Sequence, residues 1–253
     1  MRYGQMDWTA LRDEIAKWHR KGLTLPIWWR DDDATTDTAG LDRLISLSKE
    51  VGVPVHLAII PRHATPQLAK RLAGVDHIHP IVHGWAHRNN ARGRDERAEF
   101  TDARPAELNR EEAIEALRLL QRLMLDRVLP VFVPPWNHID PLALNELPGA
   151  GYKVLSTCDA RMQPEALPGL TQINTHLDPI AWREEARLHD ADYLMEKLVT
   201  ILKRRRQGKD DNSEPFGLLT HHLAMDDDVW DFTHQFWTEI LAAPHEIFEI
   251  WAL

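Results

Sequence analysis

The sequence of 253 residues contains a single cysteine, Cys158, and no long apolar run. A lone cysteine excludes an internal disulfide framework. No stretch approaches the roughly 18 apolar residues of a membrane-spanning helix. The first residues also lack the apolar core of a secretion signal. We therefore expect a soluble, cytoplasmic protein that does not associate with a membrane.

The sequence also lacks an excess of positive charge. Lysine and arginine together number 30 against 39 aspartates and glutamates, which gives a formal net charge of −9. This balance does not favour nucleic acid or an anionic membrane as a partner. One basic run, 203–206, lies at the end of a predicted helix, where its charge complements the helix dipole. The oligomeric state is left open by the sequence.

Apolar runs with strand character alternate with amphipathic helical segments about seven times. Such alternation predicts an α/β fold with a parallel sheet, most economically a closed barrel. Barrels of about 250 residues are commonly single domains, so we expect one domain spanning residues 1–253. The strands are expected at 25–30, 55–60, 77–82, 131–133, 153–156, 171–174 and 216–220.

Two further features concern the body of this fold. Residues 88–109 are polar and long for a connection, which is typical of a functional lid or a disordered segment. Asn109 and Glu112 resemble a capping box and predict that a helix begins there. Several tryptophans fall in helical apolar patterns and are expected in the core: Trp8, Trp18, Trp182, Trp230, Trp237 and Trp251.

Polar side chains follow most of the predicted strands directly. In barrels of alternating strands and helices, the loops at the carboxyl ends of the strands build the active site. We therefore expect one shared site made from these groups. They are Asp31–Asp33, Arg62 and His63, His83 and His87, Trp136 and Asn137, Asp159, His176 and Asp178, and His221 and His222.

The aspartate triplet and the histidine pair indicate a metal site. Three adjacent carboxylates repel one another, and a cation relieves that repulsion. His83 and His87 are four residues apart, so their imidazoles converge on one point if the turn is helical; the alternative is two surface histidines. Two histidines and one carboxylate on a divalent ion would leave positions for water and substrate.

Taken in order, these motifs resemble the polysaccharide deacetylase superfamily (NodB homology, carbohydrate esterase family 4). The resemblance covers roughly residues 25–225. It comprises an Asp-Asp pair after the first strand, His-x-x-x-His after the third, Pro-Pro-aromatic after the fourth and a Leu-x-His ending on the last. It implies a distorted (β/α)7-type barrel. It also implies a metal-dependent hydrolase that removes an N-acetyl group from an amino sugar or related small amide, with a small-molecule or carbohydrate substrate as the partner.

The resemblance also assigns roles to residues. Because the small residue Ala34 follows, Asp32 corresponds to the catalytic base and Asp33 to the metal ligand, with Asp31 and Asp32 as the alternative register. His83 and His87 complete the ligand set for a divalent ion, most often Zn²⁺. The general acid corresponds to His221, or to His222 in the alternative register. Substrate contacts are expected from Pro135, Trp136, Asn137, His176 and His222, while Asp178 could bind substrate, orient the acid or cap a turn.

Two departures from the family pattern stand out. The arginine that usually pairs with the catalytic aspartate is replaced by Val133, so that ion pair is absent or is supplied by Arg30, Arg62 or Arg161. Gly84 stands where serine or threonine is usual. The chain therefore resembles a divergent, intracellular branch. The alternatives are another metal-dependent amide or ester hydrolase acting on a non-sugar substrate, and a non-catalytic metal-containing protein that binds a glycan or metabolite.

Overall fold

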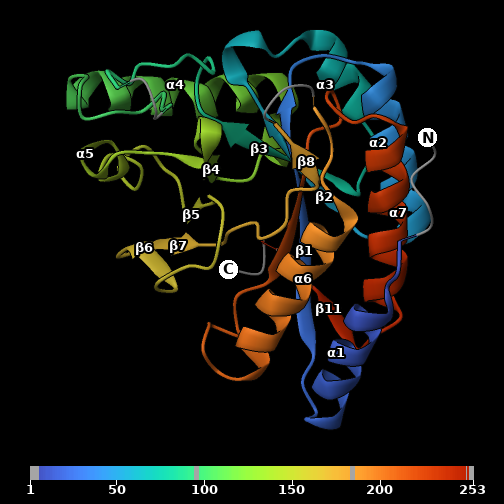
Figure 1. Ribbon diagram of the computed structural model, residues 1–253. Helices are drawn as coiled ribbons and strands as arrows, with labels where there is room; N and C mark the ends of the chain where they lie inside the picture. Colours follow the sequence, from blue (N-terminus) through green and yellow to red (C-terminus); the bar gives the residue numbers. More distant parts are fainter. Residues whose placement is uncertain (1–5, 94–96, 183–185, 249, 251–253) are drawn as a thin grey trace.

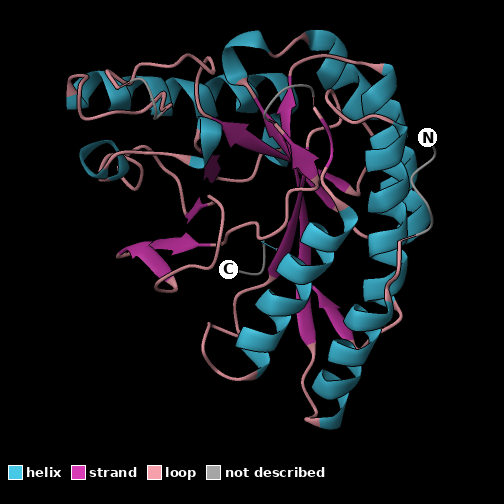
Figure 2. Cartoon of the chain, in the orientation of Figure 1, coloured by secondary structure: helices cyan, strands magenta, loops and turns pink. Residues whose placement is uncertain are grey.

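The computed structural model describes residues 6–93, 97–182, 186–248 and 250, in which helices surround a mainly parallel sheet (Figures 1 and 2). The strands are β1 (Leu25–Ala34), β2 (Val55–Ile59), β3 (Ile78–His83), β4 (Val131–Val133), β5 (Val154–Leu155), β6 (Glu165–Leu167), β7 (Leu170–Gln172), β8 (Ile180–Ala181), β9 (Arg187–Leu188), β10 (Phe216–Thr220) and β11 (His245–Ile247). The α-helices are α1 (Thr9–Arg20), α2 (Ala39–Val51), α3 (Pro66–Leu72), α4 (Ala106–Met124), α5 (Pro141–Leu144), α6 (Ala191–Arg206) and α7 (Asp227–Leu241). Short 3-10 helices are η1 (Pro61–His63), η2 (Leu125–Arg127) and η3 (Pro135–Asn137).

Seven strands run parallel in the order β10-β1-β2-β3-β4-β5-β7, and they coincide with the seven apolar runs of the sequence. The segment after β7 leads back to β10. There the backbone N–H of His176 donates to Gly217 O at 2.7 Å, and that of Leu219 donates to Leu177 O at 2.8 Å. These hydrogen bonds join the two ends of the strand order. The predicted α/β fold of the distorted (β/α)7 type is confirmed.

Side-chain alternation divides the strand residues between the barrel interior and the helical layer. Successive side chains of a strand point to opposite faces, and β2 shows this with Ala58 inside and Leu57 under the helices. The interior apolar cluster takes residues from β1 to β5, from the segment after β7 and from the segment after β11: Trp28, Ala58, Ile81, Val131, Val133, Val154, Ile173 and Ile250. The larger cluster packs between the strands and the surrounding helices.

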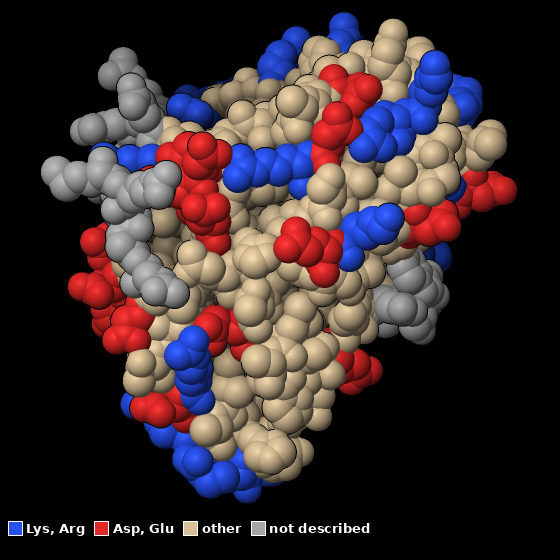
Figure 3. All heavy atoms as spheres, turned by 90° about the vertical axis from the view of Figure 1, so that its right-hand side faces the viewer, with Lys and Arg blue, Asp and Glu red and all other residues tan. Residues whose placement is uncertain are grey.

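Helices α2 and α7 lie side by side in Figure 1, and an ion pair between Arg43 and Asp227 (2.7 Å) joins them. On the face in Figure 3, side chains of both charge signs are interspersed. Among the described residues, no helix combines the length and apolar character needed to cross a bilayer.

The segment between β3 and α4 differs from expectation. Helix α4 begins at Ala106, before the predicted start. Asn109 is not its N-cap, because the Asn109 side chain is buried within the helix and its amide donates to Thr101 O at 3.0 Å. The preceding residues lie against the body, where Phe100 is fully buried and its ring packs edge-on against Phe132 with centroids 5.0 Å apart. Residues 97–105 are therefore part of the packed structure and are not a detached lid.

Candidate active site

The three aspartates at the end of β1 point in three directions because of the strand period. Interior positions alternate along β1, so Arg30 and Asp32 point into the barrel while Asp31 points toward β10. At Asp33 the backbone turns to a φ of 73°, and the pairing of β1 with β2 shifts register between Asp31 and Ala34. This bulge aims the third carboxylate at the histidines.

Asp33, His83 and His87 converge on one point. Asp33 Oδ1 lies 3.1 Å from His83 Nε2 and 3.4 Å from His87 Nε2, and the three ligand atoms all lie within 4.8 Å of one another. Trp85 and Ala86 form a bend and not a helical turn, with a positive φ at Gly84 and His87 on either side. The convergence therefore depends on an irregular turn, where the sequence pattern required a helical one.

These three residues fit a divalent metal ion. Ligand distances of about 2.0–2.2 Å place neighbouring ligand atoms roughly 3.0–3.5 Å apart, which agrees with both separations to Asp33. Asp33 Oδ1 is buried and has no well-aligned hydrogen-bond partner among the described residues, although His83 Nε2 is near it. His83 Nδ1 lies 3.1 Å from Val133 O, an arrangement that fixes the ring and leaves Nε2 free for a ligand bond.

The electrostatics of the cluster also suit a cation. Burial raises the pKa of Asp33, but the adjacent His83 imidazole, together with the charges of His221 and His87, holds it well below its ordinary value. Burial and the neighbouring His83 lower the pKa of His87. Burial also lowers the pKa of His83, yet Asp32 and Asp33 outweigh this effect and raise it. A cation at this point would replace the proton that these carboxylates favour on His83.

Arg30 forms the ion pair with Asp32 that Val133 cannot supply. Its guanidinium forms a two-pronged ion pair with Asp32, with Nε–Oδ1 at 2.9 Å and Nη2–Oδ2 at 3.0 Å. The same group donates to Ser156 Oγ at 2.7 Å and to Asn137 Oδ1 at 2.5 Å, and its side chain is fully buried. The arginine that orients the aspartate therefore comes from β1 itself, two residues earlier in the strand.

Asp31, which had a role only in the alternative register of the aspartate motif, anchors the turn after β10. It accepts hydrogen bonds from Thr220 Oγ1 at 2.6 Å and from the backbone N–H of His222 at 3.0 Å, and lies 2.5 Å from His222 Nδ1. Burial lowers the pKa of His222, but Asp31 outweighs this and raises it. With His222 held outside the barrel, His221 lines the cavity and packs edge-on against Trp182 at 4.6 Å.

A cavity of about 430 Å³ contains most of the residues predicted from the motifs. It is lined by Asp32, Asp33, His83, His87, Trp136, Asn137, Asp178 and His221 from the prediction, and by Arg97 and Trp182 in addition. Asp178 accepts hydrogen bonds from Ile180 N at 2.8 Å and from Trp182 Nε1 at 2.9 Å, so it caps a turn and fixes the indole. Trp136 packs against His87 at 4.4 Å.

Three predicted substrate contacts do not reach this cavity. Pro135 is buried behind Gly84, His222 is held by Asp31, and His176 lies in a sealed network with Glu214 and Arg205. Conversely, Trp182 is half exposed on the cavity rim, so the expectation that it lies in the core is wrong. Of the other tryptophans expected in the core, Trp8, Trp18, Trp230 and Trp237 are buried, and Trp251 lies outside the described residues.

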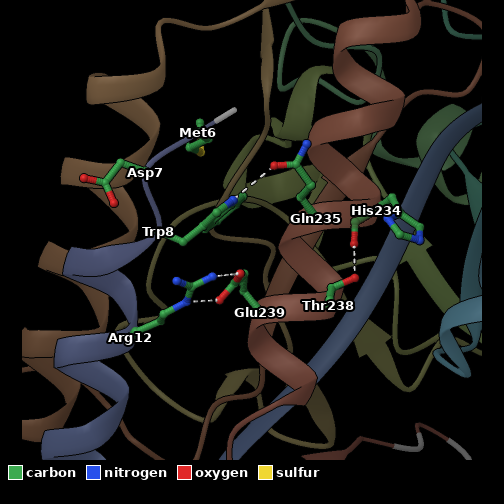
Figure 4. A pocket seen from close by; sticks show the side chains of 8 residues that line it. All are labelled: Met6, Asp7, Trp8, Arg12, His234, Gln235, Thr238 and Glu239. Atoms are coloured by element: carbon green, nitrogen blue, oxygen red, sulfur yellow. Dashed lines mark hydrogen bonds and ion pairs between the residues drawn. The ribbon is translucent and has the colours of Figure 1, made fainter. Parts of the chain in front are cut away.

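A second cavity, of about 470 Å³, lies between α1 and α7 (Figure 4). Its polar side chains pair with one another: Arg12 forms an ion pair with Glu239, and Trp8 Nε1 donates to Gln235 Oε1 at 3.2 Å. It is slightly larger than the barrel cavity, but its groups satisfy each other, whereas the barrel cavity gathers metal-ligand atoms. We therefore place the candidate active site in the barrel.

No family model matches the sequence, and no curated protein matches it. Solved structures do match its fold. A Mycobacterium smegmatis protein classed with the polysaccharide deacetylases has a TM-score of 0.66 at 15% identity, over 90% of this chain and 88% of that one. A family 4 acetyl xylan esterase from Clostridium thermocellum, in complex with a cobalt ion, has a TM-score of 0.50 at 11% identity, over 88% and 86%. A family 4 carbohydrate esterase pseudoenzyme from Bacillus anthracis has a TM-score of 0.57 at 13% identity, over 91% and 65%.

At such low identity the likeness concerns the fold. The chain has the fold of the polysaccharide deacetylases and family 4 carbohydrate esterases, in agreement with the resemblance in its motifs.

Proposed function

We propose that this protein is a metal-dependent deacylase that removes an N-acetyl or related acyl group from an amino sugar or similar small amide. The observation that carries the proposal is the convergence of Asp33, His83 and His87, in one cavity with Asp32 and His221. The fold shared with the polysaccharide deacetylases supports it.

In this proposal Asp33, His83 and His87 hold the ion, with Zn²⁺ as the expected metal. A bound divalent ion supplies Lewis acidity to the acyl oxygen and lowers the pKa of water from about 16 toward about 7. Asp32, oriented by Arg30, accepts the proton of the attacking water.

His221 stands at the same cavity and donates a proton to the departing amine. Its ring is held against the edge of Trp182, whose indole N–H is fixed by Asp178. Trp136 and Trp182 both line the cavity and offer apolar surfaces on which a sugar ring can stack.

The first experiment measures bound metal in the purified protein and in Asp33→Ala and His83→Ala. We expect about one divalent ion in the wild type and a strong loss in both variants, because each removes one of three ligands. His234→Ala is the matched control, since this histidine lies on α7 in the other cavity. A metal-free wild type, or variants that keep their metal, would refute the site.

The second experiment measures acetate release from N-acetylated sugars, from oligosaccharides and from aryl acetates. Release from an N-acetylated sugar is the expected result. Release from the aryl acetates alone would instead indicate an esterase that acts on a non-sugar substrate.

A non-catalytic binding role is the second candidate, because a family 4 pseudoenzyme shares this fold. It predicts that the metal-loaded protein binds an acetylated sugar but releases no acetate. The presence of both Asp32 and His221 in the cavity favours the enzyme.

A further inference from the structure

The turn that carries His83 and His87 is folded around a buried carboxylate. Glu99, which is 1% exposed, accepts hydrogen bonds from the backbone N–H groups of Trp85 at 2.9 Å and Ala86 at 2.8 Å. A third comes from the backbone N–H of Arg88 at 3.2 Å. Buried backbone N–H groups need such acceptors. The Glu99 carboxylate therefore accepts from three backbone donors of the irregular turn that carries the two histidines.

Contacts outside the turn fix Glu99 in place. The backbone carbonyl oxygen of Glu99 accepts hydrogen bonds from Asn90 Nδ2 at 2.7 Å and from Arg104 Nη1 at 3.2 Å. The next residue, Phe100, is packed against Phe132 of β4. The position of Glu99 is therefore set by β4 and by the segments on either side of it, in addition to the turn itself.

Gly84 is matched to this arrangement. Its φ is +54°, and a Cβ atom there would lie 2.3 Å from Glu99 Oε2 and 2.5 Å from Pro135 Cδ. No larger residue fits between the carboxylate and the proline. The departure at Gly84 is thus explained by the entry of Glu99 beneath the turn.

We propose that Glu99 is a positioning residue of the metal site. Through the backbone of residues 85–88 it holds His87, at its positive φ, with Nε2 facing Asp33. Its carboxylate charge also acts on the His87 imidazole. This inference rests on the proposed metal site, and the same experiment separates the two.

Glu99→Gln tests the proposal. The amide cannot accept from all three backbone donors, because its NH₂ group faces at least one of them, and the negative charge is removed. We expect metal affinity to fall by about 10- to 100-fold, as is typical when a group that orients a ligand is changed. Glu112→Gln is the matched control: this carboxylate pairs with Arg104 in the same region at 2.7 Å but is not among the acceptors of the turn.

Affinity is measured by competition with a chromophoric chelator, and ligand geometry by the visible absorption spectrum of the Co²⁺-loaded protein. A merely structural role for Glu99 would lower the unfolding midpoint without changing that spectrum. We expect Glu99→Gln to weaken binding and alter the spectrum, and Glu112→Gln to leave both unchanged. If Glu99→Gln does not fold, Glu99→Asp is measured in its place. This variant keeps the charge but moves the carboxylate away from the turn by one methylene. We expect it to weaken metal binding and to alter the spectrum as well.

Wild-type affinity and spectrum in the folded Glu99 variant would overturn the inference while leaving the proposed function intact. Equal losses in the Glu99 and Glu112 variants would also overturn it. A wild type that binds neither Zn²⁺ nor Co²⁺ would instead overturn the metal site itself.

Discussion

Two buried arginine–carboxylate networks in this barrel have similar chemistry and different surroundings. In one, Arg30 pairs with Asp32, and Asp32 lines the cavity. In the other, Arg205 Nη2 lies 3.5 Å from Glu214 Oε2, and His176 Nε2 lies 3.1 Å from the same oxygen. All these side chains are almost fully buried.

The difference lies in what else each carboxylate contacts. Glu214 also accepts from the backbone N–H groups of Arg161 and Asn174, both at 3.1 Å, so its oxygens are occupied by the protein. Asp32 is held from one side by Arg30 and is open to the cavity on the other. The Arg30–Asp32 pair therefore leaves a carboxylate that faces the cavity, whereas the carboxylate of the Arg205–Glu214 pair is sealed.

The largest expected effect comes from breaking the open network at its carboxylate. Asp32→Asn should lower kcat by about 10²- to 10⁴-fold, because the amide cannot take up a proton. Steady-state acetate release measures this. Metal content should remain at the wild-type level, since Asp32 is not in the ligand cluster; unchanged turnover would remove Asp32 as the base.

Breaking the sealed network should instead affect stability. Glu214→Gln leaves Arg205 buried without its counter-charge, which costs about 3–5 kcal/mol of unfolding free energy. Guanidinium unfolding measures the loss, and Glu50→Gln, an exposed carboxylate paired with His234, is the control. The metal affinity of the folded variant should not change. A large loss of bound metal would contradict the assignment of the Glu214 network to stability alone.

A third region, inside the barrel, contains the buried histidines His56 and His79. Their lowered pKa values predict that the free energy of unfolding depends on pH. Burial and the neighbouring His79 lower the pKa of His56 to about 3, so the unfolded chain binds a proton there more readily than the folded one. This stabilising contribution is present above pH 6.5 and is lost as the pH falls toward 3. Between pH 7 and pH 5 the loss is about 2 kcal/mol.

Urea unfolding at both pH values tests this, with His56→Gln as the comparison. The variant should lose about 2 kcal/mol less than the wild type over the same interval. His79, whose pKa is lowered to about 4, acts in the same direction and is present in both proteins. Equal losses would mean that His56 does not titrate as its burial implies.

The smallest effect is expected at the exposed neighbour of Arg205. Arg204 pairs with Asp210 at 2.7 Å, but its side chain is half exposed, so Arg204→Met should change the unfolding free energy by less than about 1 kcal/mol. Arg205→Met, one residue along the same basic run, should cost several times more. Unfolding midpoints compare the two, and similar values would show that burial does not decide the strength of these pairs.

The basic run 203–206 also illustrates how tertiary contacts change the meaning of a pattern. Arg204, Arg205 and Arg206 each have a carboxylate partner, in Asp210, Glu214 and Glu14 respectively. Most of the charge of this run is therefore paired within the protein.

All seven strands could be predicted from the sequence, since each is a short apolar run bounded by turns. The sequence also placed the ligand-type residues at one end of the barrel, because the carboxyl ends of parallel strands meet there. The separation of Asp31 from Asp32 follows from the two-residue period of a strand, which the sequence contained.

The contacts that these residues make depend on the three-dimensional packing of distant segments and could not be predicted from the sequence. Arg30 contacts Ser156 and Asn137, more than a hundred residues away, and no local pattern connects them. The choice of His221 for the cavity depends on Asp31 holding His222, and the sealing of His176 depends on Glu214 and Arg205. The shape of the turn that carries His83 and His87 likewise depends on Glu99, whose buried carboxylate accepts hydrogen bonds from Trp85 N and Ala86 N although it lies 14 and 13 residues further along the chain.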